Sequence, residues 1–275
     1  MMGLRGVMRI LTLCALLLPI SRVLAEDMPL PEAADVIAKV NARDDGAQAM
    51  RKITMILRDK GGSERTRETV SWRKWYGAEK KTILFFQSPA NVRDTGFLTF
   101  DYGDTNKDDD QWLYLPAARK VRRISATDRG DWFVGTDFTY EDMKKETKIS
   151  AEDFTFKMLG VQDADGHRCY KVEATPVDTA TAKELGYARG VSWFDAEIWV
   201  SRRTEYFDAG GKPLRTVLTQ DIEQIDSIWT AMRITATNHR TGHVTEFQFS
   251  DVDYKTPVDD GMFTEQALAR GARGN

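Results

Sequence analysis

From position 52 onward, hydrophobic and polar residues alternate in short segments, which is the pattern of β-strands. Ile53, Met55 and Leu57 fall on one face of the first such segment, because successive side chains of a strand point to opposite faces. Gly61-Gly62 then predicts a hairpin turn into a return strand. Comparable segments follow at 70–76, 82–86, 96–102, 111–115, 154–159, 169–174, 196–200, 203–207, 214–222, 230–237 and 244–252. The pattern predicts about eleven antiparallel strands in a sandwich or barrel.

Helical spacing is confined to short segments outside this alternation. Ala33, Ile37 and Val40 recur at helical intervals in residues 31–43, and Pro31 suits a first helical turn. Residues 180–187 are expected to form a short helical insertion, and residues 261–269 a closing helix. Residues 125–148 combine two glycines and six acids with aromatic side chains, which favours loops and short helices.

The N-terminal 25 residues have the pattern of a secretory signal peptide. Arg5 and Arg9 precede an apolar run over residues 10–20, and Val23-Leu24-Ala25 places short side chains where a signal peptidase cleaves. The run is about half of the roughly 20 residues that a membrane span needs. We expect cleavage after Ala25, export to the periplasm and one mature domain over residues 26–275; an uncleaved N-terminal anchor is the alternative.

Charge and cysteine content argue against two properties, nucleic-acid binding and an internal disulfide. Removing the three arginines of the first 25 residues leaves 36 basic and 42 acidic side chains, a net charge of −6. Nucleic-acid binding needs a basic face, so nucleic acid is not an expected partner. Cys169 is the single cysteine after position 25, so the mature chain forms no internal disulfide.

Motifs for catalysis, cofactors and metals are absent from the sequence. It contains no phosphate-binding glycine loop, no dinucleotide fingerprint and no GxSxG elbow. His239 and His243 flank Gly242 in a predicted turn, so they are expected to be solvent-exposed rather than metal-binding. The acidic run 104–110 lacks the glycine and glutamate of a calcium loop and is interpreted as a solvated turn. We expect no enzyme, cofactor or metal.

Two further features leave alternatives open. The basic residues Arg119, Lys120, Arg122 and Arg123 are either a solvated edge that balances nearby acids or a contact for lipid headgroups or a partner protein. Residues 83–86 carry large apolar side chains at every position, whereas a strand with one wet face alternates. Both faces are therefore covered, either by protein in a closed core or by a ligand.

Three blocks in close succession resemble one family. They read RDTGFLTFDYG at 93–103, DDDQWLYLPAARKVRRIS at 108–125 and GTDFTYED at 135–142. In this order and spacing they are similar to outer-membrane lipoprotein-sorting proteins of the LolA-like family. Residues 197–200 and 206–211 and the ending Phe263-Thr264 agree, so the resemblance covers most of the mature chain.

The resemblance implies an incomplete antiparallel β-barrel whose open side is plugged by helices and loops and whose apolar interior holds acyl chains. The implied function is a periplasmic carrier of a lipid or lipoprotein acyl chain, with an inner-membrane transporter and an outer-membrane acceptor as partners. An accessory or adaptor subunit of a resistance-nodulation-division-type transporter, without lipid binding, is the alternative.

We assign site residues within this frame. In 96–102, Leu98, Phe100 and Tyr102 form the more apolar face and are predicted to point inward. The lid is predicted to include Trp132, Phe133, Phe138 and Tyr140. The predicted cavity residues are Ile53, Met55, Leu57, Trp72, Leu84, Phe86, Leu98, Phe100, Tyr102, Leu113 and Leu115.

Overall fold

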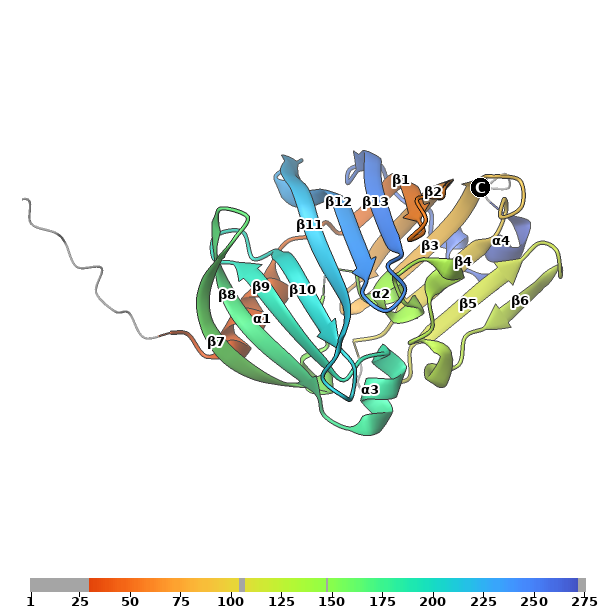
Figure 1. The fold of residues 1–275 in the computed structure, drawn as a ribbon. Helices are drawn as coiled ribbons and strands as arrows, with labels where there is room; N and C mark the ends of the chain where they lie inside the picture. The colour runs from red at the N-terminus through yellow and green to blue at the C-terminus, as the bar shows by residue number, and fades with distance from the viewer. Residues whose placement is uncertain (1–29, 104–106, 147, 272–275) are drawn as a thin grey trace, which may run out of the picture.

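A computed structural model describes residues 30–103, 107–146 and 148–271. The predicted signal peptide lies outside these residues. The described residues form thirteen strands in one antiparallel sheet, in the order β6-β5-β4-β3-β2-β1-β13-β12-β11-β10-β9-β8-β7 (Figure 1). The strands are β1 Gln48–Arg58, β2 Glu64–Tyr76, β3 Glu79–Ser88, β4 Gly96–Asp101, β5 Asp110–Leu115, β6 Lys120–Arg123, β7 Phe154–Ala164, β8 His167–Pro176, β9 Arg189–Asp195, β10 Ser201–Phe207, β11 Pro213–Ile225, β12 Ile228–Asn238 and β13 Val244–Asp253.

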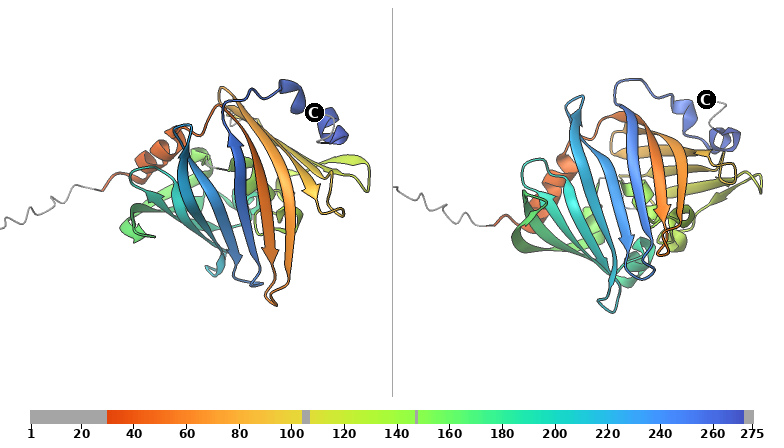
Figure 2. Two further views of the ribbon diagram at one scale, coloured as in Figure 1. Left: turned by 90° about the horizontal axis from the view of Figure 1, so that it is seen from above. Right: turned by 45° about the horizontal axis from the view of Figure 1, so that its top comes forward.

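The sheet curls without closing. Within the described residues its edge strands are β6 and β7, which do not pair with each other. The last strand in the chain, β13, pairs with the first, β1, so both lie in the middle of the sheet. The prediction of a mainly β, incomplete antiparallel barrel is confirmed, and Figure 2 shows the sheet curving around the elements on its inner side.

The strand count exceeds the predicted eleven, and one predicted strand is wrong. Residues 196–200 form a turn rather than a strand, because the Asp195 carboxylate accepts hydrogen bonds from the backbone N–H groups of Glu197 and Ile198 at 2.8 and 3.1 Å. The strand lies earlier, as β9. The basic segment at 120–123 is a further strand, β6, paired with β5.

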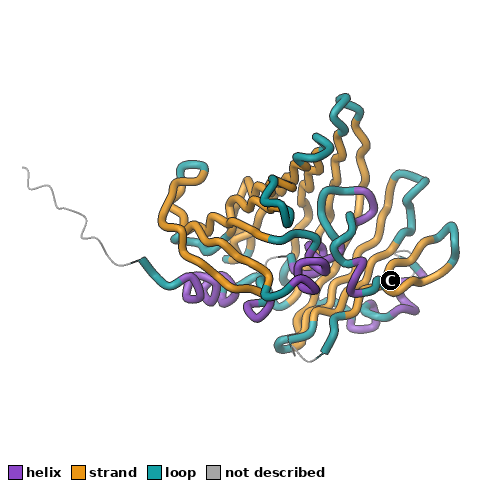
Figure 3. Tube along the Cα trace, turned by 60° about the horizontal axis from the view of Figure 1, so that its bottom comes forward, coloured by secondary structure: helices purple, strands orange, loops and turns teal. Residues whose placement is uncertain are grey.

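The helices are short and lie against the sheet (Figure 3). The predicted helices at 31–43, 180–187 and 261–269 correspond to α1 Ala33–Ala42, α3 Thr179–Leu185 and α4 Glu265–Arg270. The middle of the chain holds α2 Tyr140–Lys145 and the 3-10 turns η1 Ala126–Asp128, η2 Phe133–Gly135 and η3 Ala151–Asp153; η4 Asp260–Met262 precedes α4. We call residues 124–146 the plug.

Both faces of the β1–β5 half of the sheet are covered by protein. On the concave face, Leu84 and Phe86 of β3 pack in one buried cluster with Phe133 and Phe138 of the plug. On the convex face, Ile83 and Phe85 pack with residues of the C-terminal segment such as Phe263. The continuous apolar run of residues 83–86 is therefore explained by two protein layers, the closed-core alternative.

Candidate functional site

A cavity of about 300 Å³ lies on the concave face, displaced from the plug toward β7–β12. Its walls come from α1, the plug, the strands β7 to β13 and the adjoining parts of β1 and β2. The lining is mostly apolar and includes Ile37, Val40, Ile53, Phe138, Met143, Phe154, Phe156, Val172, Ala174, Leu185, Phe194, Trp199, Val217, Ile234, Phe247 and Phe249.

Strand alternation places these side chains. Phe154 and Phe156 of β7 both line the cavity, as do Val172 and Ala174 of β8, because residues two apart share a face of a strand. Ala174 pairs with Gly190 of β9. These two small residues stand side by side in the wall, so they leave space where larger side chains would fill it.

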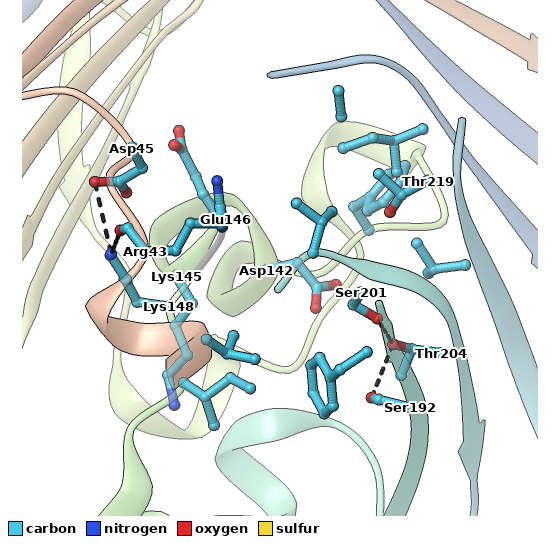
Figure 4. Close-up of a pocket in the computed structure, with 18 of the residues that line it drawn as sticks. Arg43, Asp45, Asp142, Lys145, Glu146, Lys148, Ser192, Ser201, Thr204 and Thr219 are labelled. Carbon is cyan, nitrogen blue, oxygen red and sulfur yellow. Dashed lines mark hydrogen bonds and ion pairs between the residues drawn. The ribbon is translucent and has the colours of Figure 1, made fainter. Parts of the chain in front are cut away.

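Charged side chains gather on one side of the cavity, where β1 and β2 meet the end of α1 and the plug (Figure 4). Arg51 Nη2 lies 2.6 Å from Glu146 Oε1, and Arg73 Nη1 lies 3.1 Å from Asp45 Oδ2. Lys148 Nζ donates to the carbonyl oxygens of Asn41 and Arg43 at 2.8 and 2.7 Å. This side is polar and holds the C-terminal end of α1 against the segment that follows the plug.

Hydroxyl groups form a second polar patch on the other side of the cavity. Thr204 Oγ1 lies within hydrogen-bond distance of Ser192 Oγ and Ser201 Oγ, at 2.9 and 3.0 Å (Figure 4). Asp142 lies nearby and is paired with Arg215. Burial raises the pKa of Tyr206 to about 12, against the opposing effect of Arg215, so the Tyr206 hydroxyl stays protonated. The apolar lining therefore has polar groups on two sides.

Ion pairing sets the charge state of the buried carboxylate on the charged side. Burial acts to raise the pKa of Glu146, but Arg51, Arg73 and Lys80 together outweigh it and hold that pKa below its ordinary value. Glu146 is therefore a carboxylate at neutral pH, and it is part of the structure rather than a proton donor.

The predicted cavity residues divide between several places. Ile53 lines the cavity, and so does Phe138 of the predicted lid. Other predicted residues lie on the same concave face but pack directly against the plug; these are Met55, Leu57, Leu84, Phe86 and Leu113. They form the core beside the cavity and do not border it.

The predicted inward face of β4 is wrong. Leu98 is fully buried on the convex face with Phe263 and Leu268, and Phe100 and Trp72 pack against the same cluster. Phe97 instead points to the concave side, where its ring centroid lies 5.1 Å from that of Phe133. Both faces of this strand are apolar and both are buried, so apolar content alone does not distinguish them.

Two predicted cavity residues, Tyr102 and Leu115, lie outside the lining of the cavity. Tyr102 donates a hydrogen bond from its hydroxyl to Asp110 Oδ2 at 2.9 Å and borders a second, more open cleft of about 680 Å³. Leu115, at the end of β5, is exposed.

The predicted lid residues belong to the plug and sit in different environments. Phe133 is fully buried, and Phe138 stacks on Phe247 with ring centroids 4.3 Å apart. Tyr140 contacts Phe133 edge-on, and Trp132 is exposed beside Arg215. Arg67 Nη1 donates to the carbonyl oxygen of Val134 at 2.6 Å. The segment covers the concave face; whether it moves stays a prediction.

The basic cluster lies in the turn and the second strand of the β5–β6 hairpin. Arg122 pairs with Asp128 at 3.3 Å and Arg123 pairs with Asp110, while Arg119 and Lys120 are exposed. These pairs agree with an edge that balances nearby acids. A contact to headgroups or a partner stays a prediction.

The expectation that His243 is a solvent-exposed turn residue is wrong. Its Nδ1 lies 2.5 Å from Asp137 Oδ2, and Thr245 Oγ1 donates to the same oxygen at 2.8 Å, so the imidazole docks the plug. Asp109 of the predicted solvated turn is also partly buried, because it pairs with Lys144 of α2. His239 is exposed, as predicted.

Most of the cavity was missed from the sequence. Its lining from β7 to β12 includes Phe156, Val172, Phe194 and Val217. The signal that could have found them is the alternation in these strands, where buried and half-buried apolar residues share one face. Arg51, Arg73 and Glu146 belong to no sequence motif, because residues that pair with one another lie up to 95 positions apart in the chain.

Comparison with known proteins places the chain in a family. A model of a family described as uncharacterized proteins matches residues 78–270, and the chain belongs to that family. Its fold is that of the outer-membrane lipoprotein-sorting, LolA-like proteins, as the sequence predicted. No curated protein matches the chain.

Solved structures give the same assignment. A DUF1329 family protein from Desulfovibrio piger is 27% identical with a TM-score of 0.79, and the match covers 86% of this chain and 97% of that one. A domain assigned as an outer membrane lipoprotein-sorting protein, from Vibrio parahaemolyticus, is 29% identical with a TM-score of 0.78, covering 86% and 98%. A LolA superfamily protein from Nitrosomonas europaea is 18% identical with a TM-score of 0.66, covering 86% and 100%, and supports the fold alone.

In the part of the chain that the structure describes, every helix is too short or too polar to cross a membrane.

Proposed function

We propose that the protein is a periplasmic carrier that holds a lipid or lipoprotein acyl chain in the cavity and delivers it toward the outer membrane. The observation that carries the proposal is the largely apolar cavity on the concave face of an unclosed sheet, lined by Phe156, Val172 and Phe194 among others. Each buried methylene contributes roughly 0.8 kcal/mol, so an acyl chain binds tightly without any catalytic group.

Release follows from the same energetics. A cavity that holds an acyl chain by burial alone gives it up to an acceptor that binds the chain more strongly, or after a change that weakens the site. The plug borders the cavity through Phe138 and Met143, so its displacement would open the apolar lining. An inner-membrane donor and an outer-membrane acceptor are the partners that this function requires.

The test is acyl binding with a cavity-filling variant. Ala174→Trp places an indole between the cavity walls and should weaken binding of a fluorescent fatty-acyl probe by at least about tenfold, the equivalent of roughly 1.4 kcal/mol. Thr175→Trp is the matched control, since Thr175 is the next residue of β8 and is exposed on the other face. Native mass spectrometry of the exported protein should find bound lipid.

The contrary outcome is equally specific. If the folded wild-type protein binds no acyl probe, carries no lipid and co-purifies with an inner-membrane transporter, it is an accessory subunit and the carrier proposal is wrong. Equal effects of Ala174→Trp and Thr175→Trp would place the acyl site elsewhere on the protein.

A further inference from the structure

The charged side of the cavity holds more positive than negative charge. We call Arg43, Arg51, Arg73 and Lys148 the basic wall; all four line the cavity. The carboxylates of Asp45 and Glu146 line the same side. Arg51 pairs with Glu146 at 2.6 Å and Arg73 with Asp45 at 3.1 Å. Lys145 and Glu141 also line the cavity, but Lys145 pairs with Glu141 and with Asp153. Apart from these, four cations face two anions, and the closest ion pairs take up both carboxylates.

The remaining two cations are bonded mainly to carbonyl groups. Arg43 Nη1 donates to the carbonyl oxygen of Trp229 at 3.2 Å. Lys148 Nζ donates to two carbonyl oxygens at the end of α1, and its distance to Asp45 Oδ1 is 3.7 Å. Carbonyl groups satisfy hydrogen bonds but carry no net charge, so the positive charge is left without a full counter-ion.

The electrostatics of these two side chains agree with that geometry. Burial lowers the pKa of Arg43 and of Lys148, and repulsion from neighbouring cations, Arg73 among them, lowers each pKa further. Asp45 acts in the opposite direction on both without restoring the ordinary value. A buried cation whose pKa is lowered gains stability when an anion arrives beside it.

The basic wall also contains buried hydrogen-bond donors that have no acceptor in the described part of the chain. The buried Nε atoms of Arg43 and Arg73 have no hydrogen-bond partner among the described residues. A buried donor without an acceptor costs free energy, and an oxyanion supplies the charge-assisted acceptor that guanidinium groups bind best.

Space for a headgroup lies beside this wall. The second cleft, of about 680 Å³, shares Arg43, Asp45, Lys145, Lys148 and Ile149 with the cavity. The basic wall therefore stands where the apolar cavity meets a more open, polar cleft. A molecule with an apolar chain in the cavity would present its polar end to this boundary.

We infer that the ligand is an anionic amphiphile, whose alkyl chain lies against β8–β12 and whose carboxylate or phosphate headgroup binds the basic wall. This inference rests on the proposed function and names the class of ligand. Guanidinium and ammonium groups recognise both oxyanions by the same charge-assisted hydrogen bonds, so the experiment must separate the two.

The experiment compares four ligands with one twelve-carbon chain: dodecanol, dodecanoate, dodecyl phosphate and dodecylammonium. Each displaces a neutral fluorescent acyl probe from the mature protein at pH 8. We expect one or both anions to bind at least about tenfold more tightly than dodecanol, because the anions form charge-assisted hydrogen bonds with the basic wall and dodecanol does not. We expect dodecylammonium to bind most weakly. The tighter anion identifies a fatty acid or a phosphate-bearing lipid as the source.

Failure of the inference and failure of the carrier proposal give different results. If dodecanol and both anions bind equally, the cavity binds alkyl chains whatever their headgroup, and only the inference about the ligand class is overturned. If neither the acyl probe nor any of the four ligands binds the folded protein, the proposed function itself is wrong.

Charge-removing variants locate the headgroup. Arg43→Gln and Lys148→Gln should each reduce the preference for the anion over dodecanol by about five- to tenfold, and circular dichroism should show that each variant is folded. Lys157→Gln, on the exposed side of β7, removes the same charge and should change neither affinity. A folded Arg43→Gln and a folded Lys148→Gln that both keep the wild-type preference would overturn the assignment of the basic wall.

Discussion

Arg215 of β11 and Asp142 of α2 form a two-point ion pair, with Nη1 to Oδ2 at 2.5 Å and Nη2 to Oδ1 at 2.8 Å. Arg215 also donates to the carbonyl oxygen of Asp137 at 2.8 Å, and its side chain is 1% exposed. One buried guanidinium thus fixes the plug to the far half of the sheet at two positions of the chain.

Removing this guanidinium should loosen the plug. Breaking a buried pair by deleting one partner costs about 3–5 kcal/mol, because the other charge is left without its counter-ion. We expect Arg215→Met to lower the free energy of unfolding by about 3 kcal/mol and to raise hydrogen exchange in residues 131–142. Arg240→Met, which breaks the exposed pair with Asp208, should cost much less, because solvent screens an exposed ion pair. Equal costs for the two variants would contradict the anchoring role.

Acid sensitivity should depend on Glu146. Its folded-state pKa lies below the ordinary value of 4.5 because Arg51, Arg73 and Lys80 outweigh the effect of burial. A lowered folded pKa contributes stability that is fully present above about pH 4.5 and is lost as the pH falls through the folded pKa. Glu146→Gln should therefore lower stability at pH 7 and make the decline below pH 4.5 shallower. Denaturant unfolding at a series of pH values measures both, and an unchanged acid slope would refute the assignment.

Cys169 should be unreactive in the folded protein. Its side chain is fully buried, and burial together with Asp195 raises the pKa of the thiol to about 11. Because the thiolate is the nucleophile, we expect iodoacetamide at pH 8 to modify the native protein at least about 100-fold more slowly than the urea-unfolded protein. Comparable rates in the two states would show that this part of β8 opens readily.

Phe97 and Leu98 should have separable effects although they are neighbours. Each is buried, so truncation to Ala should cost about 3 kcal/mol. Phe97→Ala removes the ring that contacts Phe133 and Tyr140, so it should also raise hydrogen exchange in the plug. Leu98→Ala should instead raise exchange in the C-terminal segment, near Phe263 and Leu268. The reverse pattern would mean that the faces of β4 are assigned incorrectly.

The sequence predicts the fold well because the barrel rests on local patterns. Alternation identified most strands, and the spacing of Ala33, Ile37 and Val40 identified α1. The missed strands have local causes: β6 is short and mostly charged, and the residues after β9 look like a strand until Asp195 is seen to cap a turn there. Such a side-chain contact has no signature in periodicity.

The site was harder to predict because it depends on which face of a strand is covered by which segment. Leu98 and Phe97 are equally apolar, and only the positions of α4 and the plug decide where each points. Arg51 and Glu146 pair although they lie 95 residues apart in the chain, so the local sequence around either residue does not predict the pair. The apolar face of β1 directs Ile53 to the cavity, and its contact with a ligand stays a prediction.

The concave face is divided between two tasks. Its β1–β5 half is mostly filled by the plug, while the cavity lies mainly against β7–β12 and reaches β1 and β2 at Ala49, Arg51, Ile53 and Arg73. Substitutions along the cavity strands can therefore reshape the interior with little damage to the packed half that maintains the fold.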